Sequence, residues 1–187
     1  YNKNVTQLSE GELETLVSNA IMDYDKNNLA NFDAILRHSK LIQAIDNADD
    51  SILSNTTNIR LRKKLKPTIS LEKGYTVAMG NTLYNPHSGH NADAGGIIAS
   101  TGFFIESGTT EYFFDDDGEG NVRLYYISGG VNVYTNNTLG TITYSTGKVT
   151  LNNINISSIS NVDGSASTQI RIIVQPDSND VVPVRAQ

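Results

Sequence analysis

The feature that most constrains the fold is a change of residue type along the chain near Pro67. Nearly all of the 15 glycines lie beyond residue 73, where turn sequences such as Ser128-Gly129-Gly130 separate short β-rich stretches. Three aromatic residues precede Pro67 and eleven follow it. A chain of 187 residues is long enough for two small domains. We therefore predict an α+β protein with an α/β domain over residues 1–67 and an antiparallel all-β domain over 68–187.

The first domain is predicted to run helix, strand, helix, strand. Ser9 and Glu12 have capping-box spacing, and apolar residues then recur at three- and four-residue intervals, which predicts a helix over 9–25. The short segment 32–37 could form a strand. Ser39 can cap a second helix, whose predicted buried face is Leu41, Ile42, Ala44 and Ile45.

The last strand of this domain, over 59–66, has one apolar and one basic side. Apolar Ile59, Leu61 and Leu65 alternate with basic residues, which are Arg60, Arg62, Lys64 and Lys66. Two interpretations stay open. The basic side could be a solvated face that discourages edge-to-edge aggregation, or a docking surface for an acidic partner such as the second half of a neighbouring copy. These four basic residues are the candidate interface.

Charge and composition exclude several classes of function. Residues 1–66 hold nine basic and nine acidic residues, whereas residues 67–187 hold five and eleven and so carry the whole net charge of −6. Because phosphate binding needs clustered Lys and Arg, the second half is not expected to bind nucleic acid. No apolar run approaches the roughly 18 residues that span a bilayer, so no membrane partner is expected and the chain is predicted to be soluble. The absence of cysteine excludes disulfides, thiolate metal sites and a cysteine nucleophile.

The second domain is predicted to be a set of short antiparallel strands. These are expected at 75–79, 97–105, 110–114, 122–127, 131–135, 140–144, 148–151, 154–159 and 168–175. Two hairpins can be read directly, one around the loop 115–121 and one around Ser145-Thr146-Gly147. Because no helical stretch separates the strands, a sandwich or an irregular antiparallel sheet is expected.

The motifs that could carry chemistry are incomplete. Asp115-Asp116-Asp117-Gly118-Glu119-Gly120 could suit a calcium ion, but strands flank it and an EF-hand glutamate is missing, so a solvated hairpin loop is favoured. His87, His90 and Asp93 have three-residue spacing, yet they lie in a glycine-rich loop and His38 is the only other histidine, so a polar loop is favoured over zinc. Ser88 lacks a nucleophile elbow. We predict neither an enzyme nor a cofactor.

Both halves resemble one family. Residues 9–21, 31–46, 51–53 and 58–61 resemble the helix–strand–helix–strand region of baseplate J-like tail proteins. The stretches 114–123, 140–152 and 174–183 are similar to the wedge protein that forms the inner baseplate ring of large contractile-tailed phages. That protein is much longer, so the chain would be its C-terminal portion. Its start at Tyr1 rather than Met also predicts a fragment or a processed chain.

The resemblance implies structural work. Copies of the protein would dimerise, build a closed ring and contact other wedge and hub proteins, in a virion tail baseplate assembled in the bacterial host cytoplasm. A ring of dimers needs self-complementary faces and further contacts that close it. The alternative is a ligand- or carbohydrate-binding β module of a tail protein, using Tyr125, Tyr126 and the 115–121 loop. A tail-associated hydrolase ranks third.

Overall fold

The computed structural model describes residues 1–31, 33–90 and 96–182, and it contains two compact units. The helical unit comprises Tyr1–Ile59 together with the segment that begins at Ser178, and the β unit is Arg60–Asp177. Composition placed the expected domain boundary at Pro67, whereas contacts divide the chain at Arg60 and again at Ser178. The β unit is therefore inserted into the helical unit along the chain.

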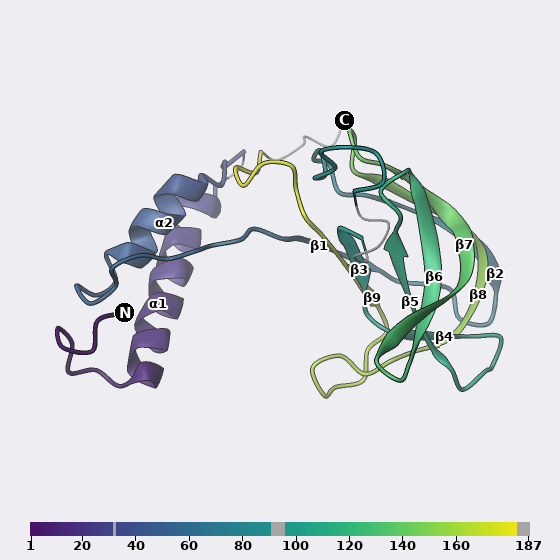
Figure 1. Cartoon of the computed structure of the whole chain (residues 1–187), viewed down its shortest axis with the longest axis horizontal. Helices are drawn as coiled ribbons and strands as arrows, with labels where there is room; N and C mark the ends of the chain where they lie inside the picture. The colour runs from purple at the N-terminus through teal and green to yellow at the C-terminus, as the bar shows by residue number, and fades with distance from the viewer. Residues whose placement is uncertain (32, 91–95, 183–187) are drawn as a thin grey trace. The chain divides into compact units, whose positions relative to one another are not determined.

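The described residues of the helical unit form two α-helices (Figure 1). Helix α1 is Glu10–Tyr24, and it begins with the predicted capping box because Ser9 and Glu12 satisfy each other's backbone N–H groups. A π-helical turn, Asp25–Leu29, follows it, and α2 is His38–Asp46. The core between the helices is small, with Tyr24, Leu41 and Ile45 buried.

Three details of the expected helix–strand–helix–strand order are wrong. Helix α2 begins at His38 rather than after a Ser39 cap, because the carboxylate of Asp180 accepts the His38 N–H at 2.8 Å. The segment expected as a strand at 32–37 forms only an isolated bridge between Leu36 and Val181, and its residue 32 lies outside the described residues. The strand predicted at 59–66 pairs within the β unit rather than with the helical unit. The broader α+β class is confirmed.

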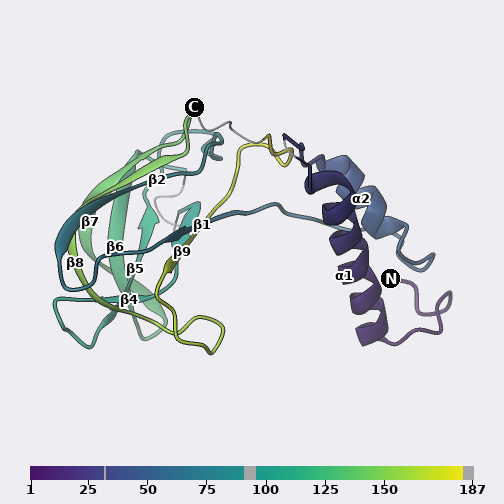
Figure 2. The same cartoon turned by 180° about the vertical axis from the view of Figure 1, so that it is seen from behind.

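In the described part of the β unit, nine strands form two antiparallel sheets, visible from both sides in Figures 1 and 2. The strands are β1 Leu61–Leu65, β2 Glu72–Ala78, β3 Ile98–Ser100, β4 Phe103–Ile105, β5 Glu111–Asp116, β6 Asn121–Ser128, β7 Val131–Thr143, β8 Lys148–Ile159 and β9 Ile170–Val174. The smaller sheet has the order β1-β9-β3, and the larger has the order β2-β8-β4-β5-β6-β7. A further pairing of β7 with β8 closes the larger sheet into a small barrel.

Most of the predicted β segments are confirmed, including both hairpins. The stretch expected as one strand at 97–105 is divided, because the chain leaves the small sheet after Ser100 and enters the barrel at Phe103. Gly102 lies at this corner, where an added Cβ would fall on the side chains of Glu111 and Ser160. The expected pairs 131–135 with 140–144, and 148–151 with 154–159, are the continuous strands β7 and β8.

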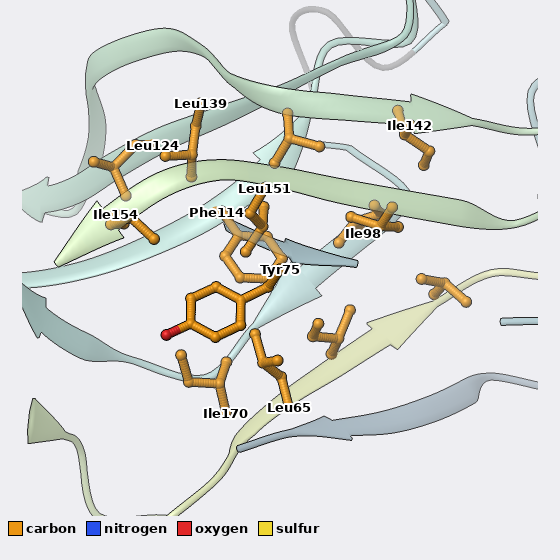
Figure 3. Close-up of a cluster of buried hydrophobic side chains, with 14 of the residues drawn as sticks. Leu65, Tyr75, Ile98, Phe114, Leu124, Leu139, Ile142, Leu151, Ile154 and Ile170 are labelled. Atoms are coloured by element: carbon orange, nitrogen blue, oxygen red, sulfur yellow. The ribbon is translucent and has the colours of Figure 1, made fainter. Parts of the chain in front are cut away.

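The main hydrophobic core lies between the small sheet and the barrel (Figure 3). Alternate residues of β9 face it, and Ile170, Ile172 and Val174 are fully buried. From the barrel, Phe103 and Phe114 contribute two equally buried rings whose centroids lie 6.2 Å apart. This core fixes the faces on which the candidate functional residues lie. Among the described residues, neither helix is long and apolar enough to cross a membrane.

Candidate interaction surfaces

The acidic loop predicted as solvated is largely a buried structural element. Asp115 and Asp116 end strand β5 and are only 3% and 0% exposed. Burying two adjacent carboxylates is costly unless each is hydrogen-bonded or paired. The prediction of a solvated loop is therefore wrong for these two residues, and their hydrogen bonds decide what the loop can do.

Asp115 forms a buried ion pair with Arg123 on the neighbouring strand β6. The Arg123 Nε–H and Nη2–H groups donate to the two Asp115 oxygens at 3.0 and 3.1 Å, and the Tyr134 hydroxyl donates at 2.7 Å. Burial raises the pKa of Asp115, and the hydrogen bonds from Arg123 and Tyr134 oppose that rise. Burial lowers the pKa of Arg123, but pairing with Asp115 outweighs it, so the guanidinium stays charged. Both Asp115 oxygens are thus occupied within the protein.

Asp116 links three parts of the β unit. Its carboxylate accepts the Ile98 N–H at 3.0 Å, the Gly118 N–H at 3.3 Å and the Tyr144 hydroxyl at 2.7 Å. Burial and the bond to Asp116 raise the pKa of Tyr144. Gly96 lies so close that an added Cβ would sit on the Asp116 carboxylate. Asp116 therefore fastens the small sheet to the barrel.

Asp117 holds the turn of the same loop. It accepts the N–H groups of Glu119 and Asn121 at 2.8 and 3.0 Å, and the Asn121 side-chain amide at 2.6 Å. Burial raises the pKa of Asp117, but these hydrogen bonds together bring it below its ordinary value. The loop thus has a structural use for all three aspartates. Within the described part of the chain, no group of three or more His, Asp or Glu residues is placed to hold a metal ion.

The two histidines considered for zinc contact each other. His90 Nδ1 lies 3.2 Å from His87 Nε2, and their rings meet edge to face. Asp93, the third expected ligand, lies outside the described residues. His38 is in the helical unit, where its Nε2 lies 2.8 Å from the Thr57 carbonyl oxygen. The structure therefore brings together two of the four residues considered.

The four basic residues of the candidate interface share one exposed side of β1 and its flanks. We call this surface the basic face; it consists of Arg60, Arg62, Lys64 and Lys66. Arg62 pairs with Ile173 of β9, which is 37% exposed, and Lys64 pairs with Arg171. Arg60 donates to the Gln175 side chain at 3.0 Å, and Arg171 is held by Asp163. A hollow of about 230 Å³ opens on this face, lined by Lys64, Arg171 and residues 166–169.

A second surface was missed by the sequence analysis because its residues come from five strands and the adjoining turn. A pocket of about 260 Å³ is lined by apolar Ile105, Leu124, Leu139 and Ile154 and by polar Glu72, Glu106, Asn136, Asn153 and Asn155. We call it the acidic pocket. Glu72 pairs with Asn155 across β2 and β8, and the Glu106 N–H donates to the Asn155 carbonyl at 3.2 Å. Only the folded barrel brings these residues together.

The helical unit leaves apolar side chains uncovered. Leu16, Ile21 and Met22 on α1 are 37%, 41% and 56% exposed. Of these three, Ile21 lines a hollow of about 390 Å³, together with Tyr1, Glu10, Leu13, Glu14, Val17 and Ser18. Exposed apolar side chains beside a hollow are typical of a surface that packs against something else.

Residues 1–64 match the profile of a family described as baseplate structural protein gp6, C-terminal domain III. None of the curated proteins searched matches the chain. The matched family is structural, which supports a structural role in a phage baseplate and a location in the virion tail baseplate. The match includes α1, α2 and most of the basic face.

Proposed function

We propose that this chain is a self-associating building block of the inner baseplate ring, of the wedge type found in the baseplate J-like family. The match of residues 1–64 to a baseplate structural domain carries the proposal. In this role the chain binds copies of itself and other wedge and hub proteins, and it has no catalytic activity of its own.

The shape of the helical unit supports self-association. Its core contains few buried apolar side chains, and Ile21, one of the exposed apolar residues of α1, lines a hollow. Covering such a face removes apolar surface from water, which stabilises an assembly by about 25 cal/mol for each Å² buried. A small core and exposed apolar side chains are expected of a building block that completes its core by packing against its neighbours.

The hydrogen bonds of the acidic loop support a structural role over catalysis. Asp115, Arg123 and Tyr134 resemble a reactive cluster by residue type, but the arginine and the tyrosine both bond to Asp115, and Asp115 and Arg123 are buried. The carbohydrate-binding alternative relied on this loop, and burial of Asp115 and Asp116 removes two of its polar groups.

Light scattering of the purified chain over a wide concentration range tests the proposal. The monomer has a mass of 20.3 kDa, and we expect the measured mass to rise to a dimer or beyond with concentration. A monomeric mass up to near-millimolar concentration would reject self-association. Electron cryomicroscopy of baseplates that carry a tagged chain tests the location, and tag density outside the inner ring would reject the wedge assignment.

A further inference from the structure

The acidic pocket has the chemistry of a receptor for a long basic side chain. Buried Leu124, Leu139 and Ile154 offer an apolar floor against which a methylene stem can pack. Glu72 and Glu106 supply two carboxylates, and the asparagines supply further acceptors for an ammonium or guanidinium group. Lysine and arginine are the side chains that combine an apolar stem with a charged, donor-rich end.

Groups in this pocket lack partners within the described residues. Among all the described residues, the ion pairs join Arg37 with Asp180, Arg123 with Asp115 and Arg171 with Asp163. Neither Glu72 nor Glu106 therefore has an ion-pair partner among the described residues. The Asn155 Oδ1 atom is buried and accepts no hydrogen bond. An unsatisfied buried acceptor destabilises the free protein, and a donor from a partner would correct this.

The basic face carries positive charges that mostly lack acidic partners among the described residues. Over the described part of the chain, Arg62, Lys64 and Lys66 make no ion pair, and the hollow between Lys64 and Arg171 has room for an acidic side chain. Exposed Ile173 lies beside Arg62 and can add an apolar contact. Each surface thus carries the charge that the other needs.

The basic face and the acidic pocket of one copy lie too far around the β unit to contact each other. In Figures 1 and 2, β1 and β9 lie along one side of the β unit, and β2 and β8 lie along the other. A contact between a basic face and an acidic pocket must therefore join two copies. Such a contact uses different surfaces on the two partners, so it repeats from copy to copy and closes into a ring when the rotation allows.

We propose that copies of this chain bind head to tail, with Arg62 and Lys64 of one copy docked on the Glu72 and Glu106 pocket of the next. The inference rests on the proposed self-association and deepens it by naming the two surfaces. This contact is separate from any two-fold dimer contact, and it can close a ring by repeating from one copy to the next.

Charge reversal at each surface tests the contact. The face variant carries Arg62→Glu and Lys64→Glu, and the pocket variant carries Glu72→Lys and Glu106→Lys. Each should raise the dissociation constant at least about tenfold at low salt, because like charges then meet. The milder Glu72→Gln and Glu106→Gln pair should give a smaller loss, which keeps the test valid if the lysine variant folds poorly. Circular dichroism verifies the fold of each variant.

Mixing the two variants distinguishes a head-to-tail contact from a general charge effect. The acidified face of one variant fits the basic pocket of the other, so an equimolar mixture should recover association that neither variant shows alone. One chain carrying all four reversals should also recover it. Matched controls on exposed residues elsewhere in the β unit, Lys148→Glu and Glu119→Lys, should leave the dissociation constant unchanged.

The outcomes separate this inference from the proposed function. If the wild-type chain is monomeric throughout, the proposed self-association fails and the inference fails with it. If the wild type associates and the reversals have no more effect than the controls, the inference is wrong while self-association stands. Loss of association in each variant without recovery in the mixture also rejects the head-to-tail pairing.

Discussion

At the scale of single residues, a sequence that suggests a cation site instead forms an internal clamp. The difference is made by Arg123 and two tyrosines, which contribute donors to Asp115 and Asp116 from β6, β7 and the turn that follows β7. The sequence contained a usable signal for this arrangement. Asp115 and Arg123 stand at matching positions of the predicted hairpin, where cross-strand neighbours meet. The bonds from Tyr134 and Tyr144 could not be foreseen, because they depend on how the barrel closes.

Removing the Arg123 guanidinium from this clamp should strongly destabilise the protein. Arg123→Met leaves the Asp115 carboxylate buried without its partner, and we expect a loss of about 3–5 kcal/mol in the free energy of unfolding. The double variant Asp115→Asn with Arg123→Met should lose less, because the buried charge is removed while Asn can still accept the Tyr134 hydroxyl. Urea unfolding measures both. An equal loss in the two variants would contradict the clamp.

The pKa of Asp117 predicts part of the acid sensitivity. Its pKa is lower in the folded protein than the ordinary value of about 3.9, so its ionised form contributes stability that is complete above that value. This contribution is lost as the pH falls through the lower, folded-state pKa. Asp117→Asn should therefore flatten the dependence of the unfolding free energy on pH below about pH 5. A pH dependence identical to that of the wild type would reject this role.

At the scale of elements, the sequence predicted the features that depend on residues close together along the chain. It missed the features that depend on residues far apart. Ser9 and Glu12 are three residues apart, so the start of α1 could be predicted from the sequence. The start of α2 depends on Asp180, which is 142 residues from His38 and invisible to a local pattern. The alternation in β1 agrees with exposed Arg62 and Lys64 and buried Leu65, but the partner strand β9 lies more than 100 residues away. Strand faces are local properties, whereas strand pairing is not.

The seam that closes the barrel should be sensitive to one methyl group. A Cβ at Gly140 would lie 2.0 Å from the Thr150 carbonyl oxygen, where β7 meets β8. We expect Gly140→Ala to cost about 3 kcal/mol or more, because backbone rather than a flexible side chain must move. Gly11→Ala is the matched control. Its Cβ meets nothing within 4 Å, and alanine favours a helix by about 1 kcal/mol, so stability should rise. Thermal unfolding compares the two variants.

At the scale of the whole molecule, the two units differ in how much apolar surface they bury. The β unit buries Phe103, Phe114 and three residues of β9 completely, whereas among the described residues the cluster between the helices buries just Tyr24, Leu41 and Ile45. Stability within one chain follows such differences in local packing. We therefore expect the helical unit of the free chain to open first.

A single substitution should separate the two units in an unfolding experiment. Leu41→Ala removes a buried side chain from the small core, at a cost of roughly 2–5 kcal/mol. We expect the helical circular dichroism signal to be lost at a lower temperature while amide protons of the β unit remain protected from exchange. Loss of both signals together would show that the units unfold as one.

The chain passes between the two units twice, once before Arg60 and once after Asp177. This connection has a mechanical consequence. The outgoing strand β1 and the returning strand β9 are paired, with Leu61 opposite Val174, so both crossings leave the β unit at the same end of that pair. Tension between the units is therefore shared by two covalent strands pulled in the same direction, and it does not unzip one from the other. It is borne by the β9–β3 ladder and by the buried side chains of β9.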